Sequence, residues 1–224
     1  MRSDILIIGG GIVGSSIAYY LALRGRSGDI IVVEPDPTYA LAATPRGNGG
    51  IRQLFSLPEN IAMARYGLSF FRQFETEMAV DGDPVPIGFR RQGYLFISDR
   101  GGDRQMEQNF RLQIANEVRA DCLDREALHA RFPSLCTDDV ALAVHSPDDA
   151  WIDPYAALQG FRRKARSLGV RYVTDKVVDW QGDGRLAKRA TLASGETVDA
   201  DIHVLAAGAW SADIGAMIGL KLPV

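Results

Sequence analysis

Three glycines near the amino terminus, Gly9, Gly11 and Gly14, have the spacing GxGxxG within the sequence LIIGGGIVG. In such a motif the first glycine permits a tight turn, the second has no Cβ to obstruct a diphosphate, and the third lets a helix pack closely on a strand. The amino end of that helix offers unpaired N–H groups and a partial positive charge to phosphates. Glu34 ends the next predicted strand, from which a carboxylate binds the adenosine ribose and repels a 2′-phosphate. These residues predict a dinucleotide site that disfavours NADP.

The motif needs a strand before it and a helix after it, and the sequence provides both. Residues 4–8 form an apolar run bounded by glycines, which is typical of a strand covered on both faces in a parallel sheet. Residues 12–24 predict a helix that ends at Gly25. Residues 30–34 predict a second buried strand, and the three segments together have the size of one βαβ unit.

The remaining patterns predict an α/β fold with an insertion. A glycine-rich loop is expected at residues 40–50, and helices at 56–78, 104–118, 124–132, 154–168 and from Ser211. Strands are expected at 93–98, 140–144, 170–173, 177–180, 190–193, 197–198 and 202–207. Because the elements between residues 80 and 150 interrupt the βαβ alternation, we expect a discontinuous dinucleotide-binding domain, 1–80 and 150–224, and assign 81–149 to a substrate domain.

Composition narrows the class of partner. The chain has 224 residues, 46% of them hydrophobic, and a net charge of −3 from well-mixed charges, which argues against a nucleic-acid partner. No apolar run reaches the roughly 20 residues of a membrane span, and no secretory signal follows Met1, so we expect a cytoplasmic protein. Cys122 and Cys136 match no metal-ligand spacing; we predict no metal site and two partly buried thiols. The histidines, His129, His145 and His203, are expected to be structural or on the surface.

Four segments carry a family resemblance. The GGGIVG motif with Glu34, the sequence TPRGNGGIR (44–52), WIDP (151–154) and VLAAGAWS (204–211) resemble the FAD-dependent amine and amino-acid oxidoreductases of the D-amino-acid oxidase superfamily. Within it the chain is most similar to the branch of sarcosine oxidase and glycine oxidase, over essentially its whole length. The resemblance implies FAD as the cofactor and a GR2-type flavoprotein fold with an inserted α+β substrate-domain segment. Members of this superfamily are longer than this chain. We therefore expect the chain to be an amino-terminal portion, incomplete at the carboxyl end, that either self-associates or lacks its second half. Alone it should have weak or no activity.

The motif and the resemblance together define the predicted cofactor-binding residues. They are Gly9, Gly11, Ile12, Val13, Gly14, Glu34, Pro35, Thr44, Asn48, Gly49, Gly50, Val177, Ala207, Gly208 and Trp210. Residues 44–50 are implied to follow the pyrophosphate and ribityl chain, and Gly208 to pass close to the cofactor. The backbone of Val177 is implied to meet the adenine, although the residue by itself would be assigned to the core. Trp210 either fills the domain interior or contacts the cofactor.

Asn48 and Arg52 are the predicted catalytic residues, because the resemblance implies that they lie beside the isoalloxazine. A cation there would stabilise negative charge on reduced flavin; the alternative is that Arg52 pairs with a surface carboxylate. The implied reaction is the oxidation of a small-molecule substrate, an amino acid or secondary amine, by hydride transfer to flavin N5. Two other functions stay open: an NAD-dependent dehydrogenase, and a non-catalytic FAD-binding scaffold or assembly protein.

Overall fold

A computed structural model describes residues 1–26, 29–182 and 186–223, which form two compact units. The first unit contains Met1–Asn48, Thr76–Val85 and Pro154–Val224, and the second contains Gly49–Glu75 and Pro86–Asp153. Val224, the last residue of the predicted domain 150–224, lies outside the described residues. The sequence analysis assigned residues 49–75 to the same domain as the residues of the first unit, whereas in the structure they belong to the second unit.

The first unit is built on a sheet with the strand order β10–β11–β12–β1–β2–β9. Its parallel part consists of β1 (Arg2–Ile8), β2 (Ile30–Glu34), β9 (Arg171–Thr174) and β12 (Thr197–Leu205). The strands β10 (Val177–Gly182) and β11 (Ala187–Leu192) extend it in antiparallel fashion. The first four residues of β2 are fully or almost fully buried, as expected for a strand covered on both faces. The predicted α/β fold with a parallel, Rossmann-like core is confirmed.

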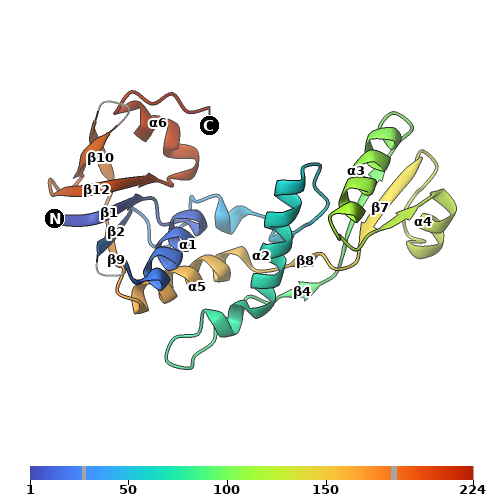
Figure 1. Ribbon diagram of the computed structural model, residues 1–224, viewed down its shortest axis with the longest axis horizontal. Helices are drawn as coiled ribbons and strands as arrows, with labels where there is room; N and C mark the ends of the chain where they lie inside the picture. Colours follow the sequence, from blue (N-terminus) through green and yellow to red (C-terminus); the bar gives the residue numbers. More distant parts are fainter. Residues whose placement is uncertain (27–28, 183–185, 224) are drawn as a thin grey trace. The chain divides into compact units, whose positions relative to one another are not determined.

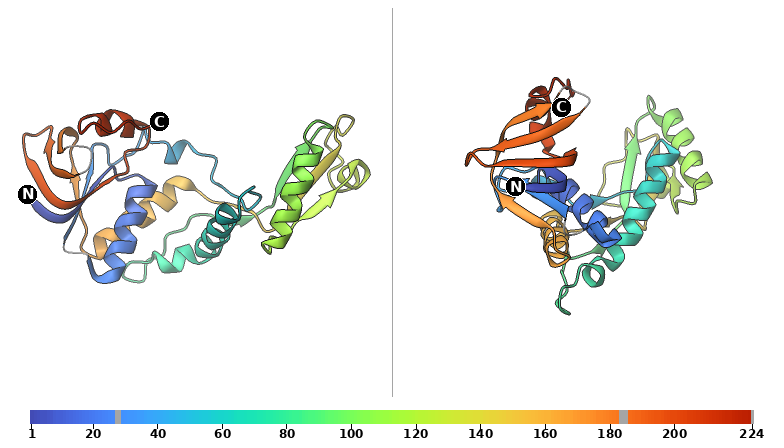
Figure 2. Two further views of the ribbon diagram at one scale, coloured as in Figure 1. Left: turned by 45° about the horizontal axis from the view of Figure 1, so that its top comes forward. Right: turned by 60° about the vertical axis from the view of Figure 1, so that its left-hand side comes forward.

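Helices α1 (Ile12–Leu21) and α5 (Pro154–Ser167) lie side by side against this sheet (Figures 1 and 2). The rings of Tyr19 and Phe161 meet between them, with centroids 5.8 Å apart. Beyond α1 the chain turns through Ala22–Arg26, where Gly25 has a φ of +83°. The predicted order of strand, glycine turn, helix and strand is therefore confirmed, with the helix ending three residues earlier than expected. A short helix, α6 (Ser211–Ala216), packs against β10.

The last long strand corrects the sequence analysis. Residues 197–198 and 202–207 were expected to form separate strands, but Thr197–Leu205 is one continuous strand. Its first residues pair antiparallel with β11, and its opposite edge pairs parallel with β1 from Arg2↔Asp199 to Ile8↔Leu205. The exposed Asp201 interrupts the apolar pattern without interrupting the backbone pairing.

The second unit contains two small sheets and the inserted helices. One sheet has the order β3–β8–β4, formed by Gly50–Ile51, Ala150–Trp151 and Arg90–Arg91, and the other the order β5–β7–β6, formed by Tyr94–Ser98, Leu142–Ser146 and Asp121–Leu123. The helices are α2 (Pro58–Glu77), α3 (Asp103–Ala115) and α4 (Arg125–Arg131). The Asp124 carboxylate accepts a hydrogen bond from Ala127 N at 2.8 Å, which confirms the predicted cap of α4. No helix in the described ranges is long and apolar enough to cross a membrane.

Candidate functional site

The glycine-rich turn joins β1 to α1 at the carboxyl edge of the parallel strands. Gly9 N donates to Val33 O at 2.9 Å, and Gly10 N donates to the Glu34 carboxylate at 2.8 Å. These bonds tie the start of the turn to the end of β2. This edge is where open α/β sheets bind their ligands.

The three motif glycines are required for different reasons. Gly9 has a φ of +103°, and a Cβ there would lie 2.5 Å from Ala206 O. A Cβ on Gly14 would lie 1.9 Å from Gly9 O, so the protein's own packing excludes any side chain at both positions. Gly11 differs, because its φ of −59° suits any residue and a Cβ would approach no closer than 4.0 Å to Thr44 Oγ1. The fold alone gives no reason for glycine at position 11, whereas a diphosphate lying against the turn does.

The N–H groups that follow Gly10 are available to a ligand. In the described chain, no hydrogen bond is formed by the backbone N–H of Gly11, Ile12 or Val13, as expected for the first turn of a helix. Val13 is also 59% exposed. Unpaired N–H groups and the positive end of the helix dipole together make this turn suitable for a diphosphate.

Glu34 stands beside the turn, as the motif requires. Its two carboxylate oxygens accept hydrogen bonds from Gly10 N and Asp36 N, at 2.8 and 3.0 Å. Each oxygen has further acceptor capacity, so the carboxylate can still receive ribose hydroxyls. Pro35, which follows directly, is exposed.

Other predicted cofactor residues of the first unit divide into two groups. Ala207 is next to Gly9, whose added Cβ would lie 2.8 Å from Ala207 Cα, and Gly208 has a φ of +56° with no other atom within 4 Å of where a Cβ would lie. Trp210 is 47% exposed, so the alternative that it fills the domain interior is wrong. Val177, by contrast, is 3% exposed and packs in a core cluster that contains residues of β1, β2, β10, β11 and β12. Its side chain is therefore structural, and the predicted adenine contact would have to be made by its backbone.

The segment from Asn48 to Arg52, which includes β3, runs from the first unit into the second. Asn48 is exposed. Gly49 has a φ of +70°, and a Cβ there would lie 2.0 Å from Ile152 O, so its close contact with Ile152, which follows β8, already explains the glycine. A Cβ on Gly50 would lie 3.1 Å from the ring of Tyr94. The two glycines therefore do not by themselves indicate a nearby flavin ring.

Within the described residues, Arg52 is a cation without an acidic partner. Its guanidinium carbon lies 5.3 Å from the ring centroid of Tyr94, and about as far from those of Phe96 (5.9 Å) and Phe55 (6.0 Å). Cation–π attraction holds the group on these rings. Because Arg52 forms no ion pair within the described chain, the alternative of a surface salt bridge is wrong. The guanidinium keeps its donors for an anionic group.

Asp149 anchors the segment that carries Arg52, a role the sequence analysis missed. The carboxylate is fully buried and accepts hydrogen bonds from Gln53 N (3.2 Å), Gln53 Nε2 (3.0 Å) and Ser146 Oγ (2.9 Å). Burial raises the pKa of Asp149, and the bonds from Gln53 and Ser146 oppose that shift. Because Gln53 and Asp149 are 96 residues apart, no local pattern could have revealed the contact.

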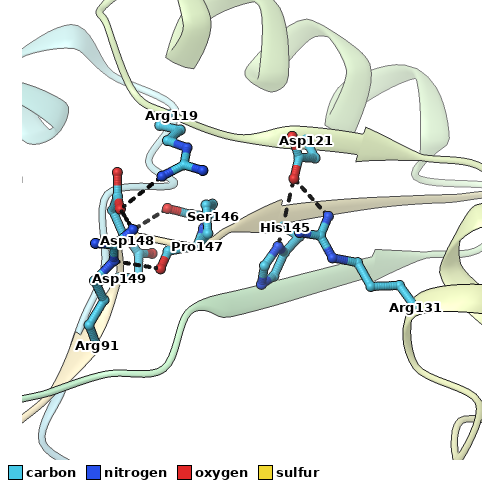
Figure 3. A network of polar contacts seen from close by, with 9 residues as sticks. All are labelled: Arg91, Arg119, Asp121, Arg131, His145, Ser146, Pro147, Asp148 and Asp149. Carbon is cyan, nitrogen blue, oxygen red and sulfur yellow. Dashed lines mark hydrogen bonds and ion pairs between the residues drawn. The ribbon is translucent and has the colours of Figure 1, made fainter.

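Asp149 borders a set of ionic contacts at the end of β7 (Figure 3). Arg91 and Arg119 approach the Asp148 carboxylate at 2.6 and 3.6 Å, and both arginines are at least half exposed. Exposed pairs of this kind contribute little to stability. In the same view His145 lies 4.0 Å from Asp121, and burial lowers the pKa of this histidine.

The remaining histidines and the cysteines are outside the candidate site. His203 accepts a hydrogen bond from Trp180 Nε1 at 2.9 Å, which makes it structural as predicted, and His129 is exposed. Cys122 and Cys136 are free and exposed, so the prediction of partly buried thiols is wrong.

Sheet order, the glycine turn and Glu34 define a dinucleotide-binding domain of the Rossmann type. Comparison with known families is more specific: the family model described as FAD dependent oxidoreductase matches residues 4–224. The chain belongs to this family. The predicted resemblance is thereby confirmed, as is FAD as the cofactor. The arrangement of Gly11 and the free N–H groups beside it fits the diphosphate of that cofactor.

Individual relatives agree with this assignment. FAD-dependent oxidoreductase domain-containing protein 1 of Bos taurus is 35% identical over 260 residues, which cover 100% of this chain and 53% of the relative. The 4-methylaminobutanoate oxidase (formaldehyde-forming) of Paenarthrobacter nicotinovorans is 27% identical, over 98% of this chain and 26% of the relative. Among solved structures, L-proline dehydrogenase from P. horikoshii matches with a TM-score of 0.84 and 28% identity, over 98% of this chain and 56% of that one. The chain thus spans about half the length, or less, of these relatives.

Proposed function

We propose that this chain holds FAD in an oxidoreductase that oxidises a secondary amine carrying a carboxylate, such as an N-substituted amino acid. The single observation that carries the cofactor site is the contrast among the motif glycines. Packing explains Gly9 and Gly14, whereas among the described residues, its two chain neighbours aside, only Thr44 Oγ1 comes near a Cβ on Gly11, at 4.0 Å. We assign the diphosphate to the space beside Gly11.

The substrate class rests on the relatives and on Arg52. Proline and 4-methylaminobutanoate, which two relatives act on according to their names, each carry a secondary amine and a carboxylate. Arg52 has no carboxylate partner in the described chain, and its guanidinium suits an anionic group. We propose that this cation stabilises the negative charge of reduced FAD, as predicted, and that it also attracts an anionic substrate.

Each part of the chain has a separate task in this reaction. FAD supplies the acceptor of the hydride that leaves the substrate carbon next to the nitrogen. The amine must be neutral, because its lone pair forms the C=N bond as the C–H bond breaks; water then hydrolyses the imine. The turn at Gly9–Val13 and Glu34 bind and orient the cofactor, and Asp149 holds Gln53 and so the segment next to Arg52. No side-chain acid or base is required.

Anaerobic mixing of the FAD-loaded full-length protein with candidate substrates tests the proposal, because this chain alone is expected to have weak or no activity. Sarcosine, proline and 4-methylaminobutanoate are compared with glycine and with D-amino acids, while the visible absorbance of the flavin is recorded. We expect bleaching by at least one secondary amino acid and none by the matched carboxylic acids that lack the nitrogen. Bound FAD that no amine reduces would favour the non-catalytic scaffold, and failure to bind FAD would contradict the proposal as a whole. The cytoplasmic location and self-association stay predictions.

A further inference from the structure

Two hydroxyl groups, those of Ser15 and Tyr172, support the glycine-rich turn through consecutive hydrogen bonds. Ser15 is fully buried on α1, and its Oγ donates to Gly10 O at 2.7 Å. Tyr172 on β9 donates its hydroxyl proton to Ser15 Oγ at 3.0 Å. The direction of both bonds is fixed, because a carbonyl oxygen only accepts and Ser15 has one hydroxyl proton to give. Burial raises the pKa of Tyr172 to about 12, so this hydroxyl stays a donor at every physiological pH.

These bonds determine which way the Gly10–Gly11 peptide faces. Gly10 N is already held by Glu34, at 2.8 Å, so Gly10 is fixed on both its N–H and its C=O side. In a trans peptide the C=O and the following N–H point to opposite sides of the chain. With Gly10 O drawn toward Ser15, the N–H of Gly11 points away from the interior, and in the described chain it has no partner.

We propose that Ser15 and Tyr172 are positioning residues for FAD, which act through Gly10 to aim the Gly11 N–H at the cofactor diphosphate. The inference rests on the part of the proposed function that locates the diphosphate beside Gly11, and it is independent of the substrate. Preorganised donors bind an anion more tightly than donors that must first reorient.

The surroundings of Tyr172 support a positional role. The Arg162 guanidinium of α5 lies 5.5 Å from the centroid of its ring, on the helix that packs against α1. Ser15 and Tyr172 are 157 residues apart in the sequence, and strand pairing between β2 and β9 brings Tyr172 opposite Val32. The helices α1 and α5 and the strand β2 therefore hold the Tyr172 hydroxyl in place. Of these three elements, only α1 contributes a residue to the GxGxxG motif.

Two conservative variants and their combination test the proposal. Ser15→Ala removes the bond to Gly10, and Tyr172→Phe removes only the bond to Ser15. FAD and ADP, which share the diphosphate, are titrated by calorimetry against the purified protein. We expect Ser15→Ala to weaken both ligands about tenfold and Tyr172→Phe about threefold, the range of one buried hydrogen bond. Because Tyr172 acts through Ser15, the double variant should bind no more weakly than Ser15→Ala alone.

Two controls and one spectroscopic measurement separate positioning from general loss of stability. Ser16→Ala is matched to Ser15→Ala, since Ser16 is on the same helix but bonds Val13 O at an exposed position. Tyr66→Phe is matched to Tyr172→Phe, since Tyr66 is 61% exposed on α2 of the second unit. Neither control should change affinity more than twofold. At saturating FAD, the ³¹P chemical shifts of the bound diphosphate should move in the Ser15 and Tyr172 variants only.

The outcomes distinguish this inference from the proposed function. Unchanged affinities, additive effects in the double variant, or ³¹P shifts equal to those of wild type would each overturn the positioning role while leaving the FAD site intact. A wild-type protein that binds neither FAD nor ADP would overturn the proposed function itself. Should Ser15→Ala fail to fold by circular dichroism, Tyr172→Phe decides the matter, because it keeps both the ring and the Ser15–Gly10 bond.

Discussion

Substituting alanine at Gly11 and at Gly14 should separate binding from folding. At Gly14 the new Cβ would lie 1.9 Å from Gly9 O, so helix α1 must shift, and we expect a loss of about 3 kcal/mol in the free energy of unfolding without ligand. At Gly11 the nearest atom is 4.0 Å away and φ is −59°, so we expect stability within about 0.5 kcal/mol of wild type, or slightly higher. FAD affinity of Gly11→Ala should nevertheless fall at least tenfold, about 1.4 kcal/mol, because the methyl group meets the diphosphate.

The assays are urea unfolding without ligand, followed by circular dichroism, and FAD titration followed by flavin fluorescence. Gly67→Ala is the control, since Gly67 lies within α2 and a Cβ there would have nothing within 4 Å. It should raise stability by about 0.5–1 kcal/mol and leave FAD affinity unchanged. The reasoning is refuted if Gly11→Ala destabilises the ligand-free protein as much as Gly14→Ala does, or if it binds FAD as tightly as wild type.

Two further predictions concern the second unit. Arg52→Met should lower the midpoint potential of bound FAD by about 20–30 mV, because it removes the cation that we propose to stabilise reduced flavin, while Arg52→Lys keeps most of the wild-type value; equal potentials in a redox titration of all three proteins would contradict this role. Asp149→Asn places an amide donor among the donors of Gln53 and Ser146. It should lower the free energy of unfolding by about 1–3 kcal/mol at neutral pH. Because burial raises the native pKa of Asp149, the native carboxyl binds a proton at a pH where the unfolded one is still ionised. The stability of wild type relative to the Asn variant should therefore rise as the pH falls through that native pKa toward the lower pKa of the unfolded chain, and a difference independent of pH in urea unfolding would show the sign to be wrong.

The local parts of the fold could be predicted because their signals are local. A run of apolar residues, a glycine turn and a helix stop lie close together in residues 2–34, and the elements formed in the expected order, with α1 three residues shorter than predicted. The continuous strand β12 was missed because its first part alternates buried Val198 and Ala200 with polar neighbours, while its second part reads as an apolar run. The two parts of β12 have different neighbours in the sheet, so their sequence patterns differ.

The supports of the candidate site could not be predicted in this way. Tyr172 meets Ser15, and Asp149 meets Gln53, only after strands far apart in the sequence have paired. Gly49 illustrates a different limitation. A glycine at this position suggested room for a cofactor, whereas the group that lies close to it is the Ile152 carbonyl. A glycine can indicate that the backbone lies close to another group, but the structure is needed to identify that group.

The pairing of β1 with β12 determines when during biosynthesis the sheet can be completed. Arg2 pairs with Asp199 and Ile8 with Leu205, so β1 has to wait until about two hundred further residues have been made before this edge can pair. At ordinary translation speeds of about 5–20 residues per second, that interval is roughly 10–40 s. During this time one apolar edge of the nascent sheet has no native neighbour and is open to chaperones or to wrong partners.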